Sequence, residues 1–237
     1  MKSYHDLLQL SAELPNRPYC IDNFISEEEH RILCDLYDSL PVFEPSSHKR
    51  ATRKDYLMFS EYVDTTQKIF YSKLQNLWPE YEVVVDGGNF TDWHSPVAPH
   101  SDNYQLQYTD LQQIEKKQEI ASYAVLVPLR TDTGHGQPYT LFFDQYYYGH
   151  GIVCGVDPTP DNVVAFTDAP FDKNSKYYPL IDYVPDKSLH GLSIQSVLPW
   201  TNRSALIWHR AQIHCASKFH GYNSKLHLIF LLTFKTR

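Results

Sequence analysis

The sequence predicts a mainly β protein with N-terminal helices, built as a double-stranded β-helix (jelly roll, cupin-like). Apolar side chains recur at helical spacing over 1–80, whereas the remainder consists of short runs rich in β-branched and aromatic residues, separated by turn residues. A length of 237 residues suits one domain, because all-β barrels and sandwiches often reach this size undivided. We therefore expect a single domain over 1–237, with helical support in 1–80 and a jelly-roll core in 81–237.

The N-terminal part is expected to begin with a short helix over 1–14 and a strand over 19–25. Ser26 and Glu29 form the pattern of a capping box, in which each side chain bonds to the backbone N–H of the other residue. This pattern predicts a helix that starts at Ser26 and runs through about Tyr37.

A polar loop is expected over 41–53, followed by a second helix over about 65–78. The aromatic and aliphatic side chains of that helix recur at helical spacing, which indicates a buried face rather than a ligand site.

The β-rich part contains six runs with strand character and two segments without clear periodicity. The segment 108–119 is polar and suits a helix or a flap. The segment 144–191 is rich in Tyr, Asp and Pro, and a connection of this length is usually functional or has its own structure. The expected strands are 81–85, 123–127, 139–143, 192–197, 204–208 and 226–234.

Composition limits the classes of partner. The formal net charge is −7 and there is no run of basic residues, so nucleic acid is not expected as a partner. The net charge does not exclude a locally basic groove. The four Cys are scattered without a C-x-x-C pair, which is typical of reduced thiols in a cytosolic protein. The N-terminus lacks the apolar stretch of a signal peptide and no apolar run spans a bilayer, so we expect a cytoplasmic protein without a membrane partner.

The only His-x-Asp or His-x-Glu in the sequence is His100-x-Asp102. On an extended backbone, residues at i and i+2 point to the same side, so an imidazole and a carboxylate converge there. With a His from elsewhere, such a pair forms the 2-His-1-carboxylate triad that suits non-heme Fe(II). Two solvated loop residues remain the alternative interpretation.

The C-terminal part supplies a distant His and a cation. His209 and His214 lie in a stretch that predicts a strand, a tight connection and the start of another strand. Lys225 follows at the mouth of the apolar strand 226–234, where an isolated cation needs an anionic partner or an exit to water. Either His could complete a metal site, and both could simply pack.

The order and spacing of these motifs resemble the iron(II)/2-oxoglutarate-dependent dioxygenase superfamily. The stretch Tyr19–Glu29 looks like the opening of its prolyl-hydroxylase-like branch. The stretch Gly136–Phe142 is similar to the Gly-Gly-x-Thr-x-Phe strand of that branch, although the second Gly is missing and the spacing differs by one residue.

The resemblance implies an enzyme that uses Fe(II), 2-oxoglutarate and O2 and releases succinate and CO2. It implies that His100, Asp102 and His214 are the catalytic metal ligands. Lys225 then pairs with the distal carboxylate of 2-oxoglutarate, and its distance from His214 favours that residue over His209. The further candidate co-substrate contacts are Thr140, Tyr139 and His227.

Two other classes of protein stay open at this point. Imidazole and carboxylate also suit Zn(II), so a zinc hydrolase or lyase could use the same ligands. A jelly-roll binding module without catalysis is the third class. For an oxygenase we expect hydroxylation of a small, amino-acid-like metabolite or of a peptidyl residue. The segments 144–191 and 108–119 are expected at the mouth of the barrel, and the sequence does not indicate an oligomeric state.

Overall fold

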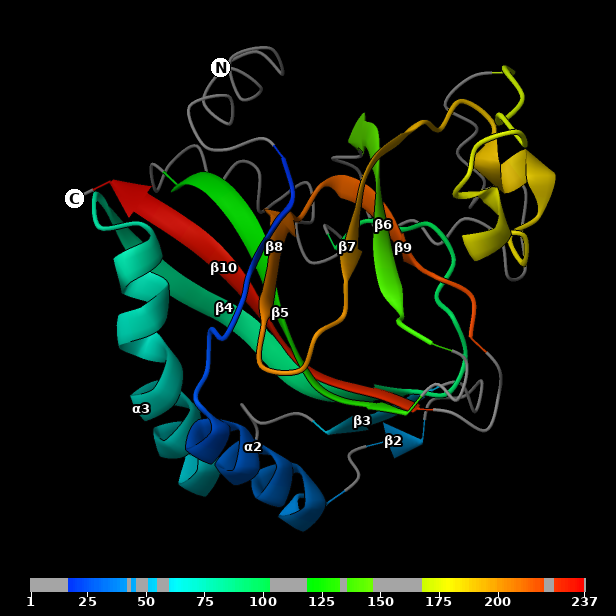
Figure 1. Cartoon of the computed structure of the whole chain (residues 1–237). Coiled ribbons are helices and arrows are strands. Elements are labelled where there is room, and N and C mark those ends of the chain that lie inside the picture. The colour runs from blue at the N-terminus through cyan, green and yellow to red at the C-terminus, as the bar shows by residue number, and fades with distance from the viewer. Residues whose placement is uncertain are drawn as a thin grey trace.

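The computed structural model describes residues 17–41, 44–45, 51–54, 60–102, 119–132, 136–146, 168–219 and 224–236. Within these ranges, two antiparallel β-sheets face each other, and two α-helices lie on the far side of the larger sheet (Figure 1). None of the helices in the described part of the chain is both long and apolar enough to cross a lipid bilayer. The expected helix over 1–14 and nearly all of 108–119 lie outside the described residues.

The larger sheet has seven strands and the smaller has three. The order in the larger sheet is β1 (Tyr19–Ile21), β8 (Ala205–His209), β5 (Glu119–Asp132), β10 (Ser224–Thr236), β4 (Tyr81–Trp93), β3 (Ala51–Lys54) and β2 (Glu44–Pro45). The order in the smaller sheet is β7 (Ile194–Pro199), β6 (Tyr139–Tyr146) and β9 (Gln212–Ala216). This two-sheet arrangement confirms the predicted jelly roll.

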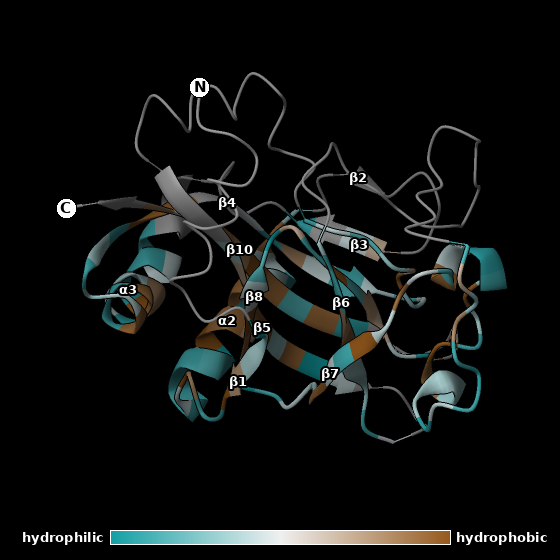
Figure 2. Cartoon of the chain, turned by 90° about the horizontal axis from the view of Figure 1, so that it is seen from above, coloured by the Kyte–Doolittle hydropathy of each residue, from teal (hydrophilic) through white to brown (hydrophobic). Residues whose placement is uncertain are grey.

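Alternation along β10 separates the helix-covered core from the space between the sheets. Leu228 and Phe230 belong to the main core, which packs under the helices, whereas Lys225, His227 and Ile229 line a cavity on the opposite face. This is the period-2 pattern of a strand whose two faces are both covered. Figure 2 shows that the strands of the larger sheet are rich in apolar residues and that the helices carry both apolar and polar residues.

The helices cover the outer face of the larger sheet. Helix α2 (Glu27–Ser39) starts with the predicted capping box: Glu29 N donates to Ser26 Oγ at 3.1 Å, and Ser26 N donates to Glu29 Oε2 at 2.7 Å. Such a cap stabilises a helix by about 1 kcal/mol. Helix α3 (Ser60–Leu77) begins earlier than the expected residue 65.

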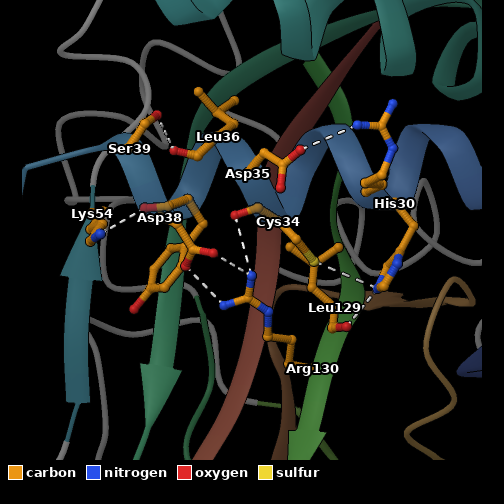
Figure 3. A network of polar contacts seen from close by, with 11 residues as sticks. His30, Cys34, Asp35, Leu36, Asp38, Ser39, Lys54, Leu129 and Arg130 are labelled. Atoms are coloured by element: carbon orange, nitrogen blue, oxygen red, sulfur yellow. Dashed lines mark hydrogen bonds and ion pairs between the residues drawn. The ribbon is translucent and has the colours of Figure 1, made fainter.

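Polar contacts also hold α2 on strand β5 (Figure 3). The Arg130 guanidinium donates to both carboxylate oxygens of Asp38, at 2.9 and 2.6 Å, and lowers the pKa of that carboxyl. His30 Nε2 lies 2.6 Å from the carbonyl oxygen of Leu129. The ion pair is about half exposed, so its contribution to stability is modest.

Two expectations about the N-terminal half were wrong in extent. Strand β4 does not end at residue 85 but continues to Trp93, because its pairing with β10 resumes after a bulge at Asp86. A bulge adds one residue to one strand of a pair, so the backbone hydrogen bonding can continue past a sequence that on its own predicts a turn. The expected loop 41–53 contains β2 and β3, since the extended β4 offers β3 a backbone edge from Phe90 to Trp93.

The described end of the expected insert covers the outer face of the smaller sheet. Residues 168–193 contain the short 3-10 helices η3 (Tyr178–Leu180) and η4 (Asp186–Leu189). Apolar residues of this segment, including Ile181 and Leu189, form a second core cluster with Leu141 and Ile213. The sequence did not predict this second core. Residues 147–167 lie outside the described residues.

Candidate metal centre and co-substrate pocket

The backbone brings the three predicted metal ligands together. His100 N donates to His214 O at 2.9 Å, and His214 N donates to His100 O at 2.9 Å, which joins the stretch after β4 to strand β9. Asp102 follows two residues later; Asp102 and His214 are buried, and His100 is half-buried. One ligand atom from each of these three residues lies within 4.8 Å of the others.

Hydrogen bonds orient these side chains for a metal. Nδ1 of His100 lies 2.8 Å from Ala98 O and Nδ1 of His214 lies 3.0 Å from Gln212 O. An Nδ1–H donated to a carbonyl fixes the tautomer in which Nε2 is the free ligand atom. The Nε2 atoms lie 3.8 and 3.5 Å from the carboxylate oxygens of Asp102, within the roughly 4 Å that two metal–ligand bonds of about 2 Å can span.

Two further contacts support this donor set. The indole of Trp208 donates from Nε1 to Oδ2 of Asp102 at 3.1 Å, which fixes the carboxylate and satisfies that oxygen. Burial lowers the pKa of His214 to about 4, although Asp102 opposes the shift. The imidazole is therefore neutral near pH 7, which is the form that binds a metal. The residues present fit a divalent ion with two nitrogen ligands and one oxygen ligand.

A cavity of about 330 Å³ lies between the sheets and reaches from this centre to Lys225. Strand β4 contributes Asn89 and Thr91, which sequence reasoning missed because the strand was expected to end before them. Thr91 Oγ1 donates to Asn89 Oδ1 at 2.5 Å. Because Oδ1 is the accepting atom of Asn89, its amide N–H groups are the donors that this side chain can offer to the cavity.

Lys225 is a buried cation in an aromatic enclosure. The residue is 1% exposed, and its Nζ lies 3.7 Å from the ring centre of Trp200 and 5.1 Å from that of Phe219. Among the described residues, Nζ has no hydrogen-bond partner. Burial lowers the pKa of Lys225 to about 7. A carboxylate entering the cavity would give this group the anionic partner that buried charges need.

The other expected co-substrate contacts divide into two groups. Thr140 and His227 line the same cavity as Lys225, and His227 Nδ1 is buried without a hydrogen-bond partner in the described part of the chain. Tyr139 is not among the described residues that line it, because successive side chains of β6 point to opposite faces. The expectation that Tyr139 faces the site was therefore wrong.

His209 does not join the three clustered residues. Its ring lies against Tyr123, with ring centres 5.6 Å apart, and against Tyr146 at 5.8 Å. Its Nδ1 accepts a hydrogen bond from Ala211 N at 3.1 Å. Of the two C-terminal candidates, the structure brings only His214 to His100. The flap expected over 108–119 lies outside the described residues, apart from Glu119.

Known proteins share this architecture. No protein-family model and no curated protein sequence matches the chain. Its structure is similar to the α-ketoglutarate-dependent epimerase SnoN from nogalamycin biosynthesis, with a TM-score of 0.57 and 12% identity over 97% of this chain and 84% of that one. HygX from Streptomyces hygroscopicus, solved with nickel and 2-oxoglutarate, gives a TM-score of 0.52 and 12% identity over 98% of this chain and 87% of that one.

A 2OG-Fe(II) oxygenase family member from Burkholderia pseudomallei gives a TM-score of 0.52 and 8% identity over 95% of this chain and 89% of that one. The chain has the fold of the 2-oxoglutarate- and Fe(II)-dependent oxygenases. This likeness confirms the superfamily fold that the motifs predicted, and it does not single out the prolyl-hydroxylase-like branch. Proteins of this fold include an epimerase, so the fold alone does not fix the reaction.

Proposed function

We propose that this chain is an Fe(II)/2-oxoglutarate-dependent oxygenase that hydroxylates a small molecule. The observation that carries the proposal is the position of Lys225, a buried cation that lines the same cavity as the clustered His100, Asp102 and His214. A metal site and a carboxylate site at two points of one cavity match a co-substrate that carries a metal-chelating end and a distant carboxylate.

In this proposal His100, Asp102 and His214 hold Fe(II) on one face. The hydrogen bonds from Nδ1 of the two imidazoles to backbone carbonyls keep both Nε2 atoms aimed at the iron. When bound, Fe(II) and 2-oxoglutarate supply the oxidation by O2, in which the co-substrate becomes succinate and CO2. With the carboxylate of Asp102 as the third protein ligand, we propose hydroxylation, or demethylation driven by hydroxylation, as the reaction.

In the proposal, Lys225 in its ammonium form binds the distal carboxylate of 2-oxoglutarate, and the hydroxyl of Thr140, which lines the same cavity, donates to the same group. His227 can add a third donor. Burial and Lys225 lower the pKa of His227 to about 3, so the ring stays neutral and donates through one N–H only. The enclosure of Trp200 and Phe219 limits access of water and so strengthens the charge-assisted bonds.

Lys225 also distinguishes this proposal from its alternatives. A zinc hydrolase or lyase could use the same three ligands, but it has no use for a second, cationic carboxylate site. A binding module would have no need of a clustered donor set with oriented Nε2 atoms.

The substrate part of the proposal has support of a coarser kind. Solved proteins of the same fold bind small molecules, namely nogalamycin RO in SnoN and hygromycin B in HygX. For this chain we propose a small metabolite, with a free amino acid as the first class to test and a peptidyl residue such as proline as the second.

The deciding experiment is anaerobic addition of Fe(II) and 2-oxoglutarate to the purified protein. A weak visible absorption band from charge transfer between Fe(II) and 2-oxoglutarate is expected, and Lys225→Met should require far more co-substrate to produce it. Succinate release on admission of O2 then serves to screen metabolites. If neither the band nor 2-oxoglutarate binding is detected while Zn(II) binds tightly, the oxygenase proposal is wrong.

A further inference from the structure

Trp200 contacts both groups that the proposed function assigns to the distal carboxylate. Its Nε1–H donates to Oγ1 of Thr140 at 2.6 Å, and its ring face lies 3.7 Å from Nζ of Lys225. The residue is 4% exposed and follows β7 directly. Strand β6 and strand β10, which carry the two partners, belong to different sheets, so the indole connects the two sheets at this end of the cavity.

The indole is itself held in place. Trp200 N donates to Pro138 O at 2.9 Å, and Gln137 Nε2 donates to Trp200 O at 2.7 Å. The ring of His227 meets the indole edge-on, with ring centres 5.3 Å apart. Because backbone and ring are both fixed, the direction of the indole N–H is fixed as well.

The hydrogen bond from Trp200 limits the directions in which the Thr140 hydroxyl can point. A hydroxyl has one hydrogen and two lone pairs. Since Oγ1 of Thr140 accepts the indole N–H, its own hydrogen must point elsewhere, and Thr140 lines the cavity beside Lys225. The same indole offers Lys225 only the face of a ring, which attracts a cation but accepts no hydrogen bond comparable to that of a carboxylate.

We propose that Trp200 is a positioning residue for the co-substrate carboxylate. Its N–H turns the Thr140 hydroxyl into a donor toward that carboxylate, and its ring holds the Lys225 side chain facing the same point. The inference rests on the proposed function, because it names the residue that arranges the site assigned there to 2-oxoglutarate.

The test separates the two contacts of the indole. Trp200→Phe keeps a ring under Lys225 and removes the N–H, Thr140→Val removes the hydroxyl, and the double variant removes both. We expect each single variant to raise the Kd of 2-oxoglutarate, measured by calorimetry on Mn(II)-loaded protein, roughly ten-fold, as for one lost charge-assisted hydrogen bond. The double variant should bind about as weakly as Thr140→Val alone, because the N–H acts only through the hydroxyl.

Kinetics and controls distinguish positioning from loss of packing. The KM for 2-oxoglutarate should rise in Trp200→Phe while kcat at saturation stays near the wild-type value, and Thr140→Ser should restore most of the affinity lost in Thr140→Val. Trp78→Phe, which alters a buried Trp in the helix-side core, should leave the Kd unchanged. Wild-type affinity in Trp200→Phe, or effects of the two single variants that multiply in the double variant, would overturn the inference.

A spectroscopic readout needs neither metal nor turnover. The chain has four Trp, so its indole N–H spectrum contains few signals, and Trp200→Phe assigns one of them. Adding 2-oxoglutarate to metal-free protein should shift the Trp200 signal. If wild-type protein binds no 2-oxoglutarate in any of these measurements, the proposed function fails; if it binds while the Trp200 signal and variants do not respond, only the role of Trp200 fails.

Discussion

His100 and His214 are hydrogen-bonded to each other through their backbones, in both directions and at 2.9 Å, although they lie far apart in the sequence. This pair joins the stretch after β4 in the larger sheet to β9 in the smaller one. Main-chain pairing therefore fixes the separation of the two backbone positions from which the imidazoles project. A metal site whose donors are placed in this way is organised before the metal binds.

Replacing any of the three clustered residues should weaken metal binding without unfolding the protein. We expect His100→Ala, Asp102→Ala and His214→Ala to abolish turnover and to weaken Fe(II) binding, because each removes one ligand while the backbone pairing persists. Metal titration and far-UV circular dichroism are the measurements. His209→Ala is the matched control and should keep its metal affinity; the opposite pattern for His209 and His214 would move the distal ligand.

Lys225→Met should separate function from stability. The substitution keeps the length of the side chain and removes a buried cation that has no hydrogen-bond partner within the described ranges. We expect the KM for 2-oxoglutarate to rise by roughly a hundred-fold or more, as for one lost charge-assisted pair in a desolvated site, while Fe(II) binding persists. The Tm of the metal-free protein should not fall. An unchanged KM would show that the lysine has another role.

The affinity for 2-oxoglutarate should fall as the pH rises above about 7. Burial lowers the pKa of Lys225 from 10.5 to about 7, and a carboxylate binds the protonated form. Binding above pH 7 must therefore take up a proton, which weakens it by up to ten-fold per pH unit. Calorimetry in buffers of different ionisation enthalpy measures this uptake. Lys225→Arg should flatten the profile, because a guanidinium does not lose its proton in this range.

The same shift gives a pH dependence of folding. Between about pH 7 and 10.5 the unfolded chain keeps the Lys225 proton and the folded protein has lost it. The unfolded state then binds more protons, so the free energy of unfolding should rise with pH across this window. Below the window both states hold the proton, and this group adds nothing to the slope. Denaturant unfolding at several pH values measures the slope. Lys225→Met should lose this part of the slope, and an identical slope in both proteins would contradict the shift.

Trp208→Phe should weaken metal binding specifically. The substitution removes the N–H that Trp208 donates to Oδ2 of Asp102 and keeps an aromatic ring in the core. Loss of such a supporting bond typically costs 10–100-fold in metal affinity, and we expect about that effect in a competition titration with Fe(II). The Kd of 2-oxoglutarate at saturating metal should change little. Equal metal affinities of variant and wild type would show that the indole does not support the ligand.

Local patterns predicted the parts of the fold that depend on neighbours in the chain. The capping box at Ser26 and Glu29 was confirmed because both bonds form within one helical turn. The end of β4 and the strand character of β3 were missed because pairing with another strand decided them. A bulge at Asp86 lets β4 continue through residues that on their own predict a turn.

The candidate site divides in the same way. The sequence by itself determined that His100 and Asp102 share a side, because i and i+2 do so on any extended backbone, and it placed Lys225 at the mouth of its strand. Only the tertiary structure brought His214 rather than His209 to His100, turned Thr140 rather than Tyr139 into the cavity, and placed Trp200 against Lys225. The physical reason is that register between strands distant in the sequence sets these contacts, and a shift of one residue reverses which side chains face inward.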